Sequence, residues 1–116
     1  MEERDLNLES PKAVVLEIES LKGLEALIKG KGRLVVDYYS PTCPPCRAMV
    51  PAYDAVAAKY CDQVAFARID AWEIPVGQNI GAVPTVIAYK MGHEVKRVVG
   101  LQSEQGLLSF VQGLLD

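Results

Sequence analysis

The stretch LVVDYYSPTCPPCR, residues 34–47, joins a nearly continuous apolar run to two cysteines that are separated only by prolines. Its apolar run, residues 34–39, is typical of a central parallel strand that is covered on both faces. Pro44 and Pro45 suit the first turn of a helix, where backbone N–H groups have no intrahelical partner anyway. The stretch therefore predicts a buried strand followed by a helix, with Cys43 at the helix N-cap.

A cysteine at a helix N-cap is favoured as a reactive thiolate. The positive end of the helix dipole and nearby N–H donors both stabilise the negative sulfur. Because the prolines remove two donors, we expect the N–H of Cys46 to reach the Cys43 sulfur. The three-residue offset brings both sulfurs close enough to bond. Cys43 is predicted to be the exposed nucleophile and Cys46 the more buried resolving thiol, with Arg47 adding positive charge.

Two other interpretations of the cysteine pair are a static disulfide and a zinc site. A CxxC pair beside a strand–helix–strand pattern in a reducing compartment is more typical of a redox motif than of a structural disulfide. A closed zinc site needs about four ligands. The remaining Cys and His residues are Cys61 and His93, and neither lies in a second ligand pair. The sequence therefore favours a dithiol that opens and closes, with no metal and no cofactor.

The size and charge of the chain exclude several classes of partner. Its 116 residues carry a net charge of −3 and half of them are hydrophobic, which fits one globular domain. The acidic balance argues against nucleic acid, and no apolar run approaches the roughly 20 residues that cross a bilayer. The N-terminal MEERD is acidic, and no apolar block of a secretory signal follows it. We expect a cytoplasmic monomer.

The hydrophobic pattern predicts further elements on both sides of the quoted stretch. A polar lead-in, residues 1–11, precedes a domain of residues 12–116. Additional strands are predicted over residues 13–19, 64–69, 85–90 and 94–99. Helices are predicted over residues 21–28, from the cysteine pair to residue 60 with a kink at Pro51, over residues 72–79, and from residue 103 to 115. The order β-α-β-α-β-α-β-β-α predicts an α/β fold with a mixed five-stranded sheet between helices.

Residues 36–47, followed by Pro51 five residues beyond Cys46, resemble the active-site region of thioredoxins. The similarity continues through RID at 68–70, VPT at 83–85, KMG at 90–92 and VG at 99–100. Each motif alone is modest, but their order and spacing are specific, and they cover about residues 13–115. The resemblance implies the thioredoxin fold, dithiol–disulfide exchange with protein disulfide substrates, and recycling by a thioredoxin reductase.

Asp37 is the one acid in the apolar strand. Burial of an unpaired carboxylate is costly and raises its pKa, whereas an Asp turned to water at a strand end would titrate normally. The resemblance implies that Asp37 is the general base or proton relay for Cys46. Thioredoxins usually place a lysine near this acid, but the matching residue here is Phe66. We therefore expect the pKa of Asp37 to be well above its usual range, unless Arg68 reaches the carboxylate.

The residue pattern and the resemblance predict different isomers of the peptide bond between Val83 and Pro84. Only about 5–6% of X–Pro bonds in folded proteins are cis, so the pattern predicts a trans bond after Val83. The resemblance implies a cis bond that faces the cysteines, with the backbone of Val83 presented to an extended substrate. It also implies an apolar docking rim, formed by Thr42, Pro44, Val83, Pro84, Val99, Gly100 and Leu101.

Two tryptophans that thioredoxins usually carry near the cysteines are missing, and Tyr39 and Thr42 stand at the matching positions. The only tryptophan is Trp72, which either packs in the core or partly replaces the lost aromatic cover over the thiols. Cys61, beyond the long helix, is expected to be a buried or half-buried structural thiol.

The first functional hypothesis is a thioredoxin-like protein-disulfide reductase. A second hypothesis keeps the fold but makes the protein a thiol oxidase or a disulfide isomerase. It arises because the residues between the cysteines influence the reduction potential, and the Pro-Pro here differs from the Gly-Pro common in thioredoxins. A third is a non-catalytic binding module. The intact cysteine pair, together with Asp37 and Pro84, argues against the binding module.

Overall fold

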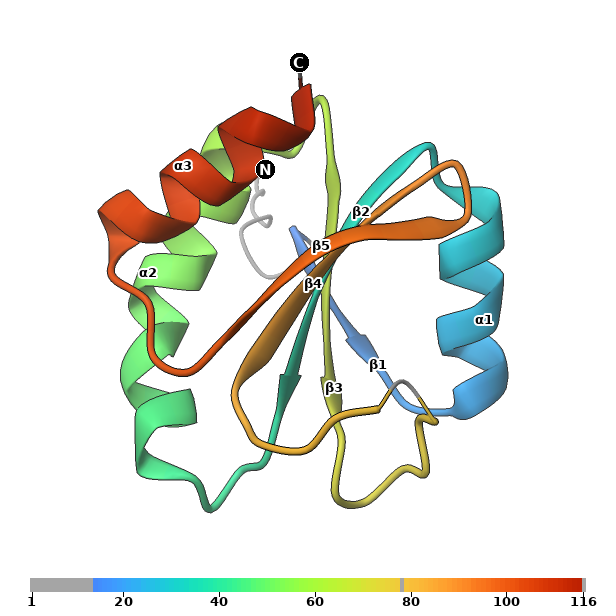
Figure 1. Ribbon diagram of the computed structural model, residues 1–116, viewed down its shortest axis with the longest axis vertical. Coiled ribbons are helices and arrows are strands. Elements are labelled where there is room, and N and C mark those ends of the chain that lie inside the picture. The colour runs from blue at the N-terminus through green and yellow to red at the C-terminus, as the bar shows by residue number, and fades with distance from the viewer. Residues whose placement is uncertain (1–13, 78, 116) are drawn as a thin grey trace, which may run out of the picture.

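The computed structural model describes residues 14–77 and 79–115, so the predicted lead-in of residues 1–11 lies outside the described residues. Five strands and three helices follow one another along this part of the chain in the order β1-α1-β2-α2-β3-β4-β5-α3 (Figure 1). The strands are β1 (Val15–Ile18), β2 (Arg33–Tyr39), β3 (Ala65–Asp70), β4 (Thr85–Lys90) and β5 (His93–Val99). The helices are α1 (Leu21–Gly30), α2 (Pro44–Tyr60) and α3 (Glu104–Leu115).

The strands form one mixed sheet in the order β1-β3-β2-β4-β5. β2 lies near its centre, parallel to β3 and antiparallel to β4. α1 covers one face of the sheet, and α2 and α3 cover the other (Figure 1). Each face has its own apolar core, one built on α1 and the other on α2 and α3. The predicted α/β architecture with a five-stranded mixed sheet is confirmed.

The centre of the sheet fixes where α2 begins. Both faces of β2 are covered, as its apolar run predicts, and residues 34–38 are all buried. The chain leaves β2 at Tyr39, and α2 starts five residues later with Cys43 as its N-cap and prolines at its first two positions. The helix continues through Pro51 to Tyr60, and the predicted kink at Pro51 stays a prediction.

The predicted helix over residues 72–79 is wrong. The described residues between β3 and β4 form turns and irregular backbone. An Asp70 carboxylate oxygen accepts hydrogen bonds from the backbone N–H groups of Trp72 and Glu73, at 3.1 and 3.0 Å, and so closes a turn directly after β3. Gly77 and Asn79 have positive φ angles of 65° and 58°, which a right-handed helix does not contain. Local turn chemistry therefore outweighs the weak apolar pattern.

None of the helices within the described ranges has both the length and the apolar character that crossing a membrane would require.

Candidate active site

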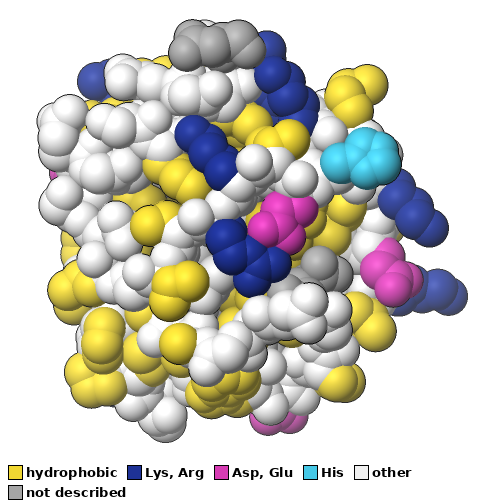
Figure 2. Space-filling view, in the orientation of Figure 1, with side chains coloured by type: hydrophobic (Ala, Val, Ile, Leu, Met, Phe, Trp, Pro, Cys, Tyr) yellow, Lys and Arg dark blue, Asp and Glu magenta, His cyan; other side chains and the backbone are white. Residues whose placement is uncertain are grey.

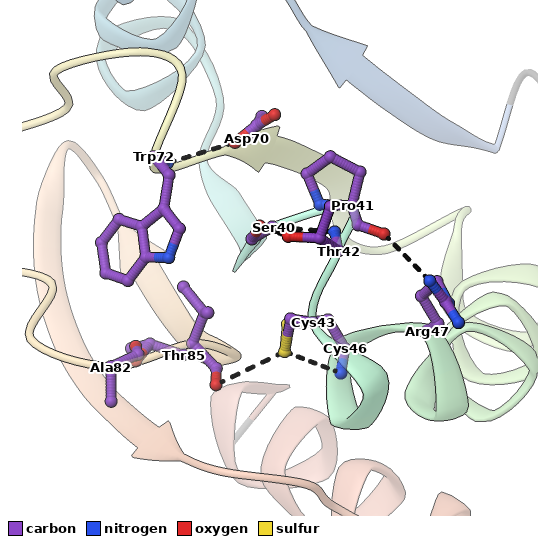
Figure 3. Close-up of a disulfide and its surroundings, with 11 residues drawn as sticks. Ser40, Pro41, Thr42, Cys43, Cys46, Arg47, Asp70, Trp72, Ala82 and Thr85 are labelled. Atoms are coloured by element: carbon purple, nitrogen blue, oxygen red, sulfur yellow. Dashed lines mark hydrogen bonds between the residues drawn. A yellow bond between two sulfur atoms is a disulfide. The ribbon is translucent and has the colours of Figure 1, made fainter.

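Cys43 and Cys46 are disulfide-bonded across the first turn of α2, with their Cα atoms 5.2 Å apart. The backbone N–H of Cys46 donates to the sulfur of Cys43 at 3.2 Å (Figure 3), which is the donor expected from the two prolines. Cys46 is 1% exposed, whereas Cys43 is half-buried. The sulfur of Cys43 therefore lies at the positive end of α2, nearer to solvent than the sulfur of Cys46.

The loop before β4 places a backbone carbonyl beside the cysteines. The Val83–Pro84 peptide bond is cis, as the resemblance implies. The Val83 carbonyl oxygen lies 3.7 Å from the Cys43 sulfur. The backbone N–H of Gly100 donates to the Pro84 carbonyl at 2.8 Å and ties the end of β5 to the same loop. The loop before β4 therefore contacts the half-buried sulfur, and the end of β5 is hydrogen-bonded to that loop.

Several predicted docking residues are exposed on this end of the molecule. Val99 and Leu101 are each 55% exposed, and Thr42 and Pro44 are exposed as well. Pro84 itself is buried, and Val83 and Gly100 are half-buried. In the view of Figure 2, apolar side chains gather toward the lower end, the end at which α2 begins in Figure 1. The docking role of these residues stays a prediction.

Trp72 does not pack in the core, because 57% of its surface is exposed. Its backbone is held by Asp70 in the turn after β3, and its indole extends toward the side of the site where Ala82, Thr85 and Cys43 lie (Figure 3). The core-packing interpretation is therefore wrong. Its role as a cover over the thiols stays a prediction.

Reduction of the disulfide should change the fluorescence of Trp72. It is the only tryptophan of the chain, so the emission reports on this loop alone. A disulfide is an efficient quencher of a nearby indole, and we expect the emission to rise when Cys43–Cys46 is reduced by dithiothreitol. The Cys43→Ser variant, which cannot form the disulfide, should show no such change. An unchanged wild-type spectrum would place the indole out of reach of the sulfurs.

Asp37 is buried in the centre of the sheet, with 1% of its surface exposed, and one of its carboxylate oxygens, Oδ1, has no hydrogen-bond partner among the described protein atoms. Burial raises the pKa of Asp37 from 3.8 to about 7, although the charge of Arg68 lowers it and those of Glu17 and Asp54 raise it. The predicted raised pKa agrees with this environment. The interpretation of Asp37 as a water-exposed residue at a strand end is wrong.

Arg68 lies on β3, directly opposite Asp37 of β2, but its side chain does not form a hydrogen bond or an ion pair with Asp37. Its Nη2 forms an ion pair with Asp54 of α2 at 2.8 Å. Its guanidinium carbon lies 5.8 Å from the ring centre of Tyr53, which also packs edge-on against Phe66. Phe66, at the position of the family's lysine, therefore belongs to the apolar core and brings no charge to Asp37.

Two charged neighbours of Asp37 were not predicted from the sequence. Glu17 of β1 accepts a hydrogen bond from the Tyr39 hydroxyl at 2.7 Å, and Asp54 holds Arg68. These contacts join residues that are 22 and 14 positions apart, respectively. The alternation of β1 could have indicated that Glu17 shares the face of Val15, but only the sheet register shows what lies opposite.

A cavity of about 260 Å³ connects Asp37 with Cys46. It is lined by Glu17, Asp37, Tyr39, Pro41, Cys46, Arg47, Val50 and Arg68. A cavity of this size can hold water between the buried carboxyl and the buried sulfur. Asp37 and Cys46 therefore share one cavity, and the relay role of Asp37 stays a prediction.

Cys61 is exposed, so the expectation of a buried or half-buried thiol is wrong. It is the C-cap of α2, and its thiol contacts the Ala58 carbonyl oxygen at 3.7 Å. Among the described residues, no three His, Cys, Asp or Glu side chains are grouped so that they could hold a metal ion.

Comparison with known proteins identifies the family. The thioredoxin family model matches residues 15–113. The chain is 36% identical over 106 residues to the thioredoxin of Echinococcus granulosus, an alignment that covers 89% of this chain and 96% of the relative. It is 34% identical over 89 residues to the thioredoxin of Peptoclostridium acidaminophilum, covering 74% and 81% of the two chains. The oxidised mitochondrial thioredoxin 3 of Saccharomyces cerevisiae superimposes with a TM-score of 0.79 at 25% identity, covering 90% of this chain and 99% of that one. The chain therefore belongs to the thioredoxin family and is a thiol–disulfide oxidoreductase.

Proposed function

We propose that the protein reduces disulfide bonds of other proteins with Cys43 as the nucleophile and Cys46 as the resolving thiol. The observation that carries the proposal is the position of Cys43, a half-buried N-cap whose sulfur accepts the N–H of Cys46. Such a position favours the thiolate, the form that attacks disulfides.

The proposed reaction has two exchange steps. The Cys43 thiolate attacks one sulfur of the substrate disulfide, so a mixed disulfide forms and the other substrate sulfur leaves as a thiolate that takes up a proton. Cys46 then loses its proton and attacks the Cys43 sulfur. The Cys43–Cys46 disulfide forms, the second substrate thiol is released, and two electrons have passed to the substrate.

Asp37 is proposed to accept the proton of Cys46 in the second step. The cavity that both residues line supports this role. A pKa of about 7 supports it as well, because a general base works best when its pKa is close to the working pH. A carboxylate with an ordinary pKa would be a much weaker base for a thiol.

The substrate is proposed to dock as an extended segment over Val83 and the exposed apolar residues near Cys43. The distance of 3.7 Å between the Val83 carbonyl oxygen and the Cys43 sulfur supports this, because it places the Val83 backbone next to the attacking sulfur. Pairing of a peptide with exposed backbone is a recurrent mode of recognition that depends little on sequence. Thr42, Pro44, Val99 and Gly100 complete the proposed contact.

The oxidised protein needs a reductant after each cycle, and we propose a thioredoxin reductase for this step. A dithiol that is regenerated in this way works in a reducing compartment, and we assign the protein to the cytoplasm as a monomer. The yeast relative named above comes from mitochondria, so fractionation of cells that express the tagged full chain is the direct test.

Insulin reduction tests the direction of electron flow. Wild-type protein with dithiothreitol should precipitate the insulin B chain well ahead of dithiothreitol alone. Cys61→Ser is the matched control, since it removes a thiol remote from the disulfide and should behave as wild type. Equilibration of the pair with glutathione buffers then gives its reduction potential. No acceleration, together with a potential as oxidising as that of known thiol oxidases, would favour the oxidase or isomerase instead.

A further inference from the structure

We propose that Arg68 is a positioning residue of the reaction, and that Asp54 anchors its guanidinium on α2 so that Asp37 is left without a full counter-charge. The inference rests on the proposed role of Asp37 as the proton relay. It concerns residues that lie outside the cysteine motif. In this arrangement the exposed Asp54 on α2 influences the pKa of the buried Asp37 on β2.

The sheet register places three charged residues in one row. Glu17 of β1 lies opposite Arg68 of β3, and Arg68 lies opposite Asp37 of β2. Because neighbouring strands in register direct paired side chains to the same face, all three face α2. Arg68 is therefore the central cation between two carboxylates, and it could pair with either of them.

Its hydrogen bonds go to neither carboxylate. Nη2 of Arg68 bonds to Asp54, while its Nε is buried without a hydrogen-bond partner among the described atoms. Oδ1 of Asp37 is likewise buried and unpartnered. A buried donor and a buried acceptor on directly opposed residues thus remain apart while the other edge of the guanidinium is held by the helix. Leaving such groups unpaired is costly, so the anchor is required to maintain the arrangement.

The other groups around Asp37 reinforce this arrangement. Glu17 is engaged with the Tyr39 hydroxyl, and the Tyr53 hydroxyl donates to the carbonyls of Val35 and Ala67 rather than to Asp37. Arg47 contacts the Pro41 carbonyl at the rim of the cavity. Arg68 is therefore the cation whose position decides how strongly Asp37 holds its proton.

Asp54→Asn is the decisive variant. The Asp54 side chain is 50% exposed, so the substitution should leave the fold intact. Without the anchor, the guanidinium is free to pair with Asp37. An opposite charge at contact distance lowers the pKa of a carboxyl by roughly one pH unit or more, so the Asp37 value should fall clearly below about 7.

The experiment is an NMR titration of the Asp37 carboxyl carbon in the reduced full-length protein, for wild type, Asp54→Asn, Arg68→Gln and the double variant. Arg68→Gln should raise the Asp37 pKa. Asp54→Asn should lower it in the wild-type background but much less in the Arg68→Gln background, because Asp54 acts through the guanidinium. Asp62→Asn, which removes an equal charge from the exposed turn after α2, should change nothing.

An equal shift from Asp54→Asn in both backgrounds, or no shift beyond that of Asp62→Asn, would overturn the inference. A separate measurement of the second exchange step, by stopped flow from pH 5 to 9, keeps the two proposals apart. If the rate midpoint follows the Asp37 pKa from variant to variant, both proposals are supported. If the carboxyl shifts as expected but the rate midpoint stays constant, Arg68 still controls Asp37, and the relay role of Asp37 is wrong.

Discussion

Replacing Cys43 with serine should reduce catalysed insulin reduction to the rate of dithiothreitol alone. The serine hydroxyl is not ionised at neutral pH and cannot form the mixed disulfide. Cys46 cannot replace it, because it is 1% exposed and a folded protein substrate cannot reach its sulfur. The loss should therefore be complete rather than partial, while circular dichroism shows an unchanged fold.

Replacing Cys46 with serine should give a different defect. Cys43 keeps its position at the N-terminus of α2 and the N–H donor of residue 46, so the first exchange proceeds. The mixed disulfide then has no resolving thiol and should accumulate, visible on a non-reducing gel and as the summed mass of the two proteins. Accumulation in Cys43→Ser but not in Cys46→Ser would mean that the roles of the two cysteines are exchanged.

The local part of the site could be predicted from the sequence because it depends on neighbours along the chain. A proline pair after a cysteine specifies a helix start, and the N–H that reaches the Cys43 sulfur follows from which donors the prolines remove. The apolar run of residues 34–39 likewise identifies the central strand. The cis bond at Pro84 was predicted by resemblance alone, since the residue pattern favours trans.

The electrostatic part of the site depends on register and could be predicted only in part. The sequence indicates that Arg68 can lie near Asp37, but nothing in it indicates that Glu17 lies opposite Arg68 on the other side, or that Asp54 is the residue Arg68 binds. The helix predicted over residues 72–79 failed for the opposite reason. There the local residues, Asp70 and Gly77, favour turns, and in the structure the turn closed by Asp70 and the positive φ of Gly77 outweigh the weak apolar pattern.

Asp37→Asn should make the protein more stable than wild type above neutral pH. Burial raises the pKa of this carboxyl from 3.8 to about 7, so the folded state holds the proton more tightly than the unfolded chain does. The proton contributes to stability below pH 3.8, and the contribution is lost as the pH rises toward 7. Above pH 7 the wild type must keep a buried carboxylate that the variant lacks.

The pH-dependent part of the difference should reach roughly 4 kcal/mol, the free energy that corresponds to a change in pKa from 3.8 to about 7. The asparagine amide also has to be accommodated in a buried site, but that penalty does not vary with pH. The comparison should therefore be the change in the stability difference between pH 4 and pH 9, measured by urea unfolding of oxidised wild type and variant.

Asp62→Asn is the matched control for this comparison, because it makes the same chemical change at an exposed position in the turn after α2. A constant difference for Asp37→Asn would mean that the carboxyl titrates normally, and its role as a base for Cys46 near neutral pH would lose its physical basis. If the stability gain appears together with a slower second exchange step, the same buried charge accounts for both effects. The ionised Asp37 then destabilises the fold at the pH at which it accepts the proton of Cys46. This is expected of a general base whose carboxylate is buried in an apolar site.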